Sequence, residues 1–456
     1  MVLIPILLFF LIFYFYEKKK NAELLVCMFA LVTNCFAFVD NVHYMLKAAD
    51  FVLLPTFYIT LREFFQNKRY FSAKKDRIAQ VVLLLLCFLL LEFLRTVFFG
   101  IDSFANALRV VRIQSLMLLY FYLRRLPPSV FARFLKIAFW LSLVQGICFY
   151  LQLFGVSMLV GRVDEAVASS DTSRYMNGPT LSVVFVIYYL LNGNFGIWKK
   201  VFVVIFFCGI LLLGMTRSTF IGLGVAWGIY LLIQHKIKHI VYMLVGYMFF
   251  MIAVLPIFES RESQAGNSTM DDLKNVFFSG DLKQIDSNSG TFSFRVGMLM
   301  ERWMYLEENS SYIPWGVGCI HEESPSNRFH FIIGTNNQGS KYGRVMIESG
   351  DITWVPILLR YGLVGVFIFG LLYYCWVKMA VLNMKCFKSP LFLTGAILAI
   401  FSVARSFVGS VFDTASGIFI LLLYLSLTVA AYSTHKKRIY EKNISGDNLL
   451  QLPSGD

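Results

Sequence analysis

The chain has 456 residues, of which 57% are hydrophobic and 15% are charged. That composition leaves too little polar surface for a water-soluble globule of this length, and it predicts a polytopic membrane protein. The formal net charge of +13 could suggest a nucleic-acid partner. Most of this charge lies in short loops between apolar segments, where it fits membrane topology and anionic lipid, so no nucleic-acid partner is expected.

Apolar segments close to the length that crosses a bilayer follow one another along the chain, and they predict an all-α bundle of about 13 transmembrane helices. The first segment has lysines after it and none before it, the reverse of a secretory signal peptide, so it is interpreted as a retained span. The predicted spans are residues 2–16, 22–39, 48–64, 78–98, 104–123, 131–154, 179–193, 199–215, 218–234, 239–258, 352–375, 389–408 and 414–433.

Lysine and arginine are concentrated in every second loop, and the positive-inside rule places those loops in the cytoplasm. This orientation puts the N-terminus outside and the C-terminus inside. It predicts four regions: an N-terminal bundle (1–258), a large outer loop (259–350), the last spans (351–433) and a cytoplasmic tail (434–456). The basic positions of the inner loops are Lys18, Lys19, Lys20, Lys68, Arg69, Lys74, Lys75, Arg77, Arg124, Arg125, Lys199, Lys200, Lys236, Lys238, Lys378, Lys385, Lys388, Lys436, Lys437 and Arg438.

Several arginines lie on the outer side, against this trend. Arg217 lies where one span ends and the next begins almost at once, and Arg174 lies just before another span. Arg109 and Arg112 share one helical face within a span. Because arginine is costly near hydrocarbon, each position predicts an anionic partner. The alternative for each is an interfacial side chain or an internal salt bridge.

The outer loop changes character along its length. Residues 259–292 are rich in Ser, Asn, Asp and Gly and predict an irregular cover. Residues 292–306 predict a helix with Arg295 and Arg302 on one face, which suits an anion clamp; the alternative is an amphipathic helix resting on the lipid interface.

Pro314, Gly316 and Gly318 follow that helix and permit close backbone approach. The charged cluster around His321 and His330 fits no standard zinc signature, so no metal is predicted. No nucleotide-binding loop or nucleophile elbow is present, and no cofactor is expected. Cys319 is the one clearly outer cysteine, which leaves no disulfide framework in the loop.

The order of these motifs resembles the O-antigen polymerase and ligase superfamily (Wzy and WaaL). The resemblance covers roughly residues 130–433. It includes Thr-Arg217-Ser at the outer end of a span, Arg295, Pro314-Trp-Gly316-Val-Gly318, and the entry to a span through residues 351–365. The earlier matches are Gln152 with Gly155 and Arg174 with Gly178.

One departure from the ligase pattern concerns its histidine. The ligase pattern is His, then Asn, Ser or Gln, nine residues, Gly, two residues and Gly. With Gly362 and Gly365 in register, the His position is occupied by Asp351 and the next by Ile352. This substitution favours a polymerase over a ligase. Asp351 is predicted as a general base, or alternatively as the N-cap of the following helix.

The resemblance implies a GT-C-like, metal-independent glycosyltransferase in the bacterial inner membrane, with its active site facing the periplasm. It would polymerise undecaprenyl-diphosphate-linked oligosaccharides, which serve as donor and acceptor, into O-antigen, capsule or exopolysaccharide. A flippase and a chain-length regulator of the same pathway would be its protein partners. Arg217 and Arg295 would bind the diphosphate, with Arg174, Arg302, Arg109 and Arg112 as further candidates. The alternatives are a ligase that transfers glycan to lipid A core or protein, and a flippase of lipid-linked oligosaccharide.

Overall fold

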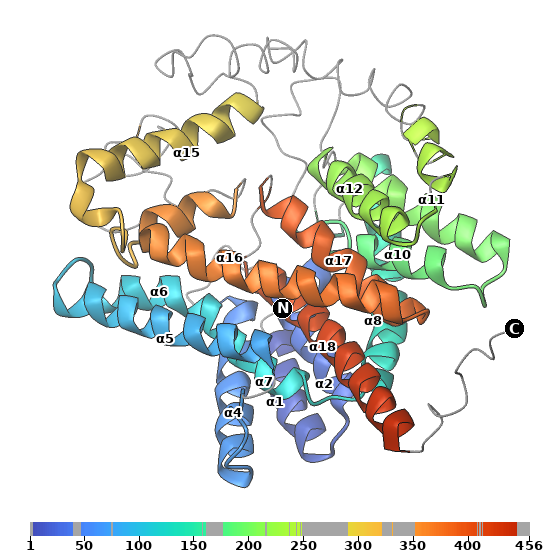
Figure 1. Cartoon of the computed structure of the whole chain (residues 1–456), viewed down its shortest axis with the longest axis horizontal. Helices are drawn as coiled ribbons and strands as arrows, with labels where there is room; N and C mark the ends of the chain where they lie inside the picture. Colours follow the sequence, from blue (N-terminus) through green and yellow to red (C-terminus); the bar gives the residue numbers. More distant parts are fainter. Residues whose placement is uncertain are drawn as a thin grey trace, which may run out of the picture.

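The chain folds into a bundle of helices of very different lengths (Figure 1). A computed structural model describes residues 3–39, 47–73, 76–156, 158–160, 177–214, 217–236, 238–242, 244–246, 248, 291–321, 331, 352–407, 409, 412 and 414–444. Among these residues the secondary structure is entirely helical, as the sequence predicts. The predicted span 239–258 and the irregular cover 259–292 lie mostly outside the described residues.

Helices lie where the sequence predicts spans, within the described part of the chain. The elements are α1 (Leu3–Glu17), α2 (Asn21–Val32), α3 (Asn34–Ala37), η1 (Ala48–Val52), α4 (Leu53–Gln66), α5 (Arg77–Phe98), α6 (Phe104–Gln114), η2 (Ser115–Leu119), α7 (Tyr120–Leu123), α8 (Pro128–Leu151), η3 (Gln152–Phe154), α10 (Ser182–Leu191), α11 (Ile197–Leu213), α12 (Arg217–Ile233), α15 (Thr291–Glu308), η6 (Ser310–Tyr312), α16 (Trp354–Cys386), α17 (Pro390–Ser406) and α18 (Ala415–Ile444).

Four of the described helices are long and apolar enough to cross a membrane, by length and composition: Arg77–Phe98, Pro128–Phe154, Trp354–Cys386 and Ala415–Tyr432. Shorter apolar helices are Leu3–Glu17, Asn21–Val32, Ser182–Leu191, Thr219–Ile233 and Pro390–Ser406. The described part of the chain is therefore all-helical, with helices suited to a membrane. The larger number of crossings stays a prediction.

Two helices continue well beyond the predicted ends of their spans. α18 continues to Ile444, into the segment predicted as a tail, and α16 continues to Cys386, past the predicted end of its span at 375. Hydropathy marks where a helix leaves the apolar region, whereas backbone hydrogen bonding continues until a residue breaks it. No Gly or Pro interrupts either extension, so both helices run on.

The predicted span 22–39 is broken at Thr33. Asn34, Cys35, Phe36 and Ala37 all have positive φ, from 52° to 62°. A left-handed turn costs about 1–2 kcal/mol per non-glycine residue, so surrounding contacts must hold it. The backbone N–H of Val160 donates to the Ala37 carbonyl at 2.7 Å, and the Phe36 ring packs edge-on against Phe29.

The turn between α1 and α2 allows a stability prediction. Lys19 has φ 54°, and the N–H groups of Lys19 and Lys20 donate to the carbonyls of Tyr16 and Phe15 at 3.0 and 2.9 Å, which is a Schellman cap. Glycine suits this left-handed position better than lysine. Lys19→Gly is therefore expected to raise the free energy of unfolding by about 1 kcal/mol, measured by thermal unfolding in detergent.

Lys18→Gly is the matched control for Lys19→Gly, because it removes the same charge from the neighbouring residue. Lys18 donates to the Tyr14 carbonyl in the helical pattern. Its replacement by glycine is expected to lower stability by up to about 1 kcal/mol. Equal melting temperatures for the two variants would contradict the left-handed cap.

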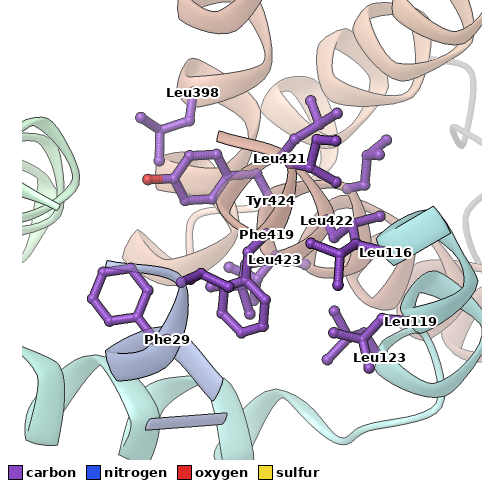
Figure 2. Close-up of a cluster of buried hydrophobic side chains, with 14 of the residues drawn as sticks. Phe29, Leu116, Leu119, Leu123, Leu398, Phe419, Leu421, Leu422, Leu423 and Tyr424 are labelled. Carbon is purple, nitrogen blue, oxygen red and sulfur yellow. The ribbon is translucent and has the colours of Figure 1, made fainter. Parts of the chain in front are cut away.

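The centre of the bundle is built around α18. Figure 2 shows Phe29 of α2, Leu398 of α17 and the leucines of η2 and α7 around the α18 side chains of Phe419, Leu421, Leu422, Leu423 and Tyr424. Thr428 accepts hydrogen bonds from two α16 side chains: the Trp376 indole reaches its hydroxyl at 3.1 Å, and the Asn383 amide reaches its carbonyl at 2.7 Å. Close packing and such interhelical bonds hold helices together in lipid, where apolar burial alone gives little preference.

Polar contacts join loops that the sequence predicts on the inner side. Glu63 at the end of α4 accepts from the Tyr16 hydroxyl at 3.1 Å and pairs with Arg125 at 3.6 Å. Arg124 pairs with Asp76 at 3.2 Å. The ends of α1, α4 and α7 therefore meet the start of α5 at one end of the bundle.

Candidate functional site

The elements that carry the predicted site meet at the start of α16. In Figure 1, α15 lies alongside the first part of α16. Met298 of α15 packs against Ile352 and Val355, and this contact lies one helical turn after Arg295. The helix predicted over residues 292–306 is confirmed, with bounds Thr291–Glu308.

The start of α16 is bonded to the end of α17. The Thr353 N–H donates to the Ser406 carbonyl at 3.2 Å, and the Thr353 hydroxyl donates to the Gly409 carbonyl at 2.7 Å. The Trp354 indole donates to the Ser406 hydroxyl at 3.1 Å. We call Thr353, Trp354, Arg405, Ser406 and Gly409 the α16–α17 corner.

α12 lies beside α17 with its first residue toward this corner. Gly222 of α12 is in contact with Phe401 of α17, because a Cβ at Gly222 would lie 3.3 Å from that ring. At the other end of α12, the Gln234 amide donates to the Met384 carbonyl of α16 at 2.7 Å. α16 and α17 are consecutive, so these contacts make α12 antiparallel to α17. Arg217 begins α12, five residues before Gly222, and so lies at the same end as the corner.

The segment after α15 crosses the kink of α16. We call residues 313–320 the crossing segment. Val317 and Gly318 donate to the carbonyls of Leu359 and Arg360 at 2.9 and 3.0 Å. Leu363 and Val364 in turn donate to the carbonyls of Ile313 and Pro314 at 2.9 and 3.1 Å. The crossing segment therefore supplies hydrogen-bond partners that the kink removes from α16.

Glycine makes this crossing possible. Gly362 has φ 60° and ψ −159°, a region open to little besides glycine. A Cβ there would lie 2.5 Å from the Gly316 nitrogen, and a Cβ at Gly316 would lie 2.4 Å from the Arg360 carbonyl. At Gly318 a Cβ would lie 2.8 Å from the Thr96 hydroxyl. At Gly365 it would meet the side chain of Tyr361 on the preceding turn. The structure thus brings the predicted motif glycines together.

A partly buried ion pair on α5 holds the crossing segment from the other side. Arg95 donates through Nε and Nη2 to Glu92 at 2.9 and 2.7 Å, and through Nη2 to the carbonyls of Trp315 and Gly316 at 3.1 Å each. The Glu92 side chain is 3% exposed. The Thr96 hydroxyl accepts from the Cys319 N–H at 2.9 Å. Sequence reasoning missed this pair, although opposite charges three residues apart within an apolar span were a usable signal.

Arg360 and Cys319 lie inside the same crossing. Arg360 is 2% exposed and donates through Nε to the Ile320 carbonyl at 3.0 Å. Burial raises the pKa of the Cys319 thiol to about 11, so the thiol stays protonated and unreactive near neutral pH. A charged residue inside the predicted span 352–375 was also a signal that the sequence offered for Arg360.

The predicted arginines are placed differently from one another. Arg295 lies half-buried on α15 near the start of α16. Arg302 is fully buried, pairs with Glu301 at 2.6 Å, and lies 4.3 Å from the centre of the Phe331 ring. Burial lowers the pKa of Arg302 to about 10, which still leaves it protonated at neutral pH. These contacts favour a role for Arg302 in holding α15.

Arg112 and Arg109 lie on α6. Arg112 forms an ion pair with Asp50 at 3.1 Å, so the internal salt bridge named as its alternative is present. Arg109 is exposed. An anion at Arg112 would have to compete with the Asp50 carboxylate. Both assignments to the diphosphate stay predictions.

Asp351 and Arg174 lie outside the described residues, and for Arg217 the structure describes the backbone position. Asp351 immediately precedes Ile352, which packs under α15. Within the described part of the chain, no group of three His, Cys, Asp or Glu side chains could hold a metal ion. No protein-family model matches this chain, and no curated protein matches its sequence.

Proposed function

We propose that this protein is a membrane glycosyltransferase that joins undecaprenyl-diphosphate-linked oligosaccharides into a surface polysaccharide on the outer side of the bacterial cytoplasmic membrane. The observation that supports it most is the convergence of four elements. The start of α12, the middle of α15, the start of α16 and the end of α17 meet at one end of the bundle. Arg217, Arg295 and the residue that follows Asp351 belong to these elements.

The distribution of lysine and arginine among the loops that border the helix ends supports a site that faces the periplasm. The ends that carry Glu63, Arg125 and Asp76 form one polar cluster, and each borders a loop that is rich in lysine or arginine. At the convergence of α12, α15, α16 and α17, the short connections 214–216 and 407–414 contain no lysine or arginine. The segment 259–350 does contain basic residues, but it is longer than the loops whose charge sets orientation. Under the positive-inside rule the first group faces the cytoplasm and the second faces the periplasm.

The chemistry explains why arginine suits such a site. A sugar hydroxyl of one lipid-linked repeat attacks the anomeric carbon of the other substrate, which forms the new glycosidic C–O bond. The bond from that carbon to the diphosphate oxygen breaks, and the oxygen leaves with the electron pair. Arg217 and Arg295 would offer bidentate, permanently charged contacts to the phosphate oxygens as this charge develops. Asp351 would accept the proton from the attacking hydroxyl.

The test is incubation of the purified protein with a synthetic lipid-linked repeat unit and separation of the products by size. We expect a ladder that lengthens by one repeat at a time with no second acceptor added. Transfer that requires lipid A core or a protein acceptor would instead identify a ligase. Lipid translocation in proteoliposomes without a new glycosidic bond would identify a flippase.

A further inference from the structure

Arg405 is a further cation at the end of the bundle where the proposed site lies. It lies at the end of α17, one residue before Ser406, whose carbonyl and hydroxyl bind Thr353 and Trp354. Its side chain runs along Gly409, because a Cβ at Gly409 would lie 3.4 Å from both Cγ and Nε of Arg405. Arg405 is therefore part of the corner at which α16 begins.

The surroundings of Arg405 contain hydroxyls in place of carboxylates. Among the described residues, the groups that interact electrostatically with its guanidinium are Tyr373 and Tyr424. A cation in the apolar part of a membrane protein calls for an anion, and the described part of the corner supplies none. An anionic ligand would meet that need.

The Tyr373 hydroxyl is a second feature that points to a ligand. Tyr373 is 4% exposed, and its hydroxyl has no hydrogen-bond partner among the described residues. It interacts electrostatically with Arg405. The Ser406 hydroxyl, which donates to the Val403 carbonyl at 2.7 Å and accepts from Trp354, is a polar neighbour of Tyr373 but forms no hydrogen bond with its hydroxyl. A buried hydroxyl left without a partner is costly, so it is poised to donate to an oxygen that enters the corner.

The start of α16 adds backbone donors to the same corner. Thr353 precedes the first helical residue, and its side chain makes no capping bond; its hydroxyl donates to the Gly409 carbonyl. The first N–H groups of a helix attract anions through their free donors and the helix dipole. The corner and the neighbouring Tyr373 thus combine a guanidinium, a hydroxyl donor and the backbone N–H groups of Trp354 and Val355, whereas Pro356 has no N–H to offer.

We propose that the α16–α17 corner binds the diphosphate headgroup of a polyprenyl lipid, with Arg405 and the Tyr373 hydroxyl as its side-chain donors. This inference rests on the proposed function for the identity of the lipid. Arg405 lies four residues after Phe401, and Arg217 lies five residues before Gly222, which contacts Phe401. Because α12 and α17 are antiparallel and a helix rises about 1.5 Å per residue, the backbones of Arg217 and Arg405 lie at a similar level along the bundle. The corner therefore extends the predicted Arg217 and Arg295 site.

The test measures binding of a sugar-free polyprenyl diphosphate to the purified protein in detergent. Arg405→Gln is expected to weaken binding at least about tenfold, and Arg405→Lys less, because one charge-assisted contact is lost. Arg69→Gln, an exposed arginine on a predicted inner loop, is the control and should bind like the wild type. Inorganic pyrophosphate as competitor distinguishes a headgroup site, which it would occupy, from recognition of the lipid tail.

Tyr373→Phe separates a ligand role from a structural one. Removal of a hydroxyl that lacks a partner should leave the melting temperature of the ligand-free protein unchanged or raised. The same change should weaken polyprenyl diphosphate binding about threefold to tenfold. Unchanged affinity in both Tyr373→Phe and Arg405→Gln would overturn the proposal. A large loss of thermal stability in Arg405→Gln with normal affinity would instead indicate an internal ion pair with an acidic residue outside the described ranges.

The binding measurement and the product ladder test the two proposals separately. If the wild type binds the lipid and Arg405→Gln does not, the corner is a diphosphate site even when no ladder forms. If a ladder forms and Arg405→Gln neither weakens binding nor slows extension, the proposed function stands and the role of Arg405 is refuted.

Discussion

Gly362→Ala is expected to prevent the crossing segment from docking on α16. The new Cβ would lie 2.5 Å from the Gly316 nitrogen and 2.6 Å from the Ile313 carbonyl oxygen, and φ 60° with ψ −159° is strained for alanine. Neither partner is a flexible side chain that could move aside, so the free energy of unfolding should fall by at least about 4 kcal/mol. The measurement is thermal unfolding of the detergent-solubilised protein, followed by monodispersity on gel filtration.

Gly370→Ala provides the control in the same helix. A Cβ at Gly370 would meet nothing within 4 Å, and its backbone is ordinary helix. Alanine there should leave stability unchanged or raise it by up to about 1 kcal/mol. If both variants melted at the same temperature, the kink and the backbone bonds across it could not exist as described. Gly316→Ala tests the same contact from the other side and should resemble Gly362→Ala.

Arg295→Lys is expected to slow chain extension by about 100-fold while leaving the melting temperature close to that of the wild type. Lysine keeps the charge but loses the planar pair of donors that matches a phosphate, and loss of one such contact to the leaving group typically costs about 10²–10³ in rate. Arg217→Lys should behave in the same way. Rates come from the product ladder under single-turnover conditions, and folding is checked by thermal unfolding.

Arg302→Lys supplies the contrast to Arg295→Lys. Arg302 is fully buried against Phe331 and paired with Glu301, so its replacement should lower thermal stability more than it lowers the rate per folded molecule. Full retention of chain extension in Arg295→Lys and Arg217→Lys would refute the bidentate diphosphate role.

The local part of the site could be predicted from the sequence to a large extent. The helix that carries Arg295, the short connection between α11 and α12, and the need for glycine after Pro314 all follow from patterns within a few residues. The partner of each motif could not be predicted. Gly316 contacts Gly362, which lies 46 residues later in the sequence, and nothing near either residue specifies that contact. Arg95 likewise supports the carbonyl of Gly316 from a helix that the motif order does not include.

The sequence by itself determined that this chain is helical, that its helices suit a membrane, and where most of those helices lie. It could do so because hydropathy and helix periodicity act over one or two turns. The tertiary structure decided where the helices break and which distant motifs meet. It also decided which arginines pair with acids, as Arg112 does with Asp50, and which lie among hydroxyls, as Arg405 does. These outcomes depend on packing between distant segments, which local composition does not encode.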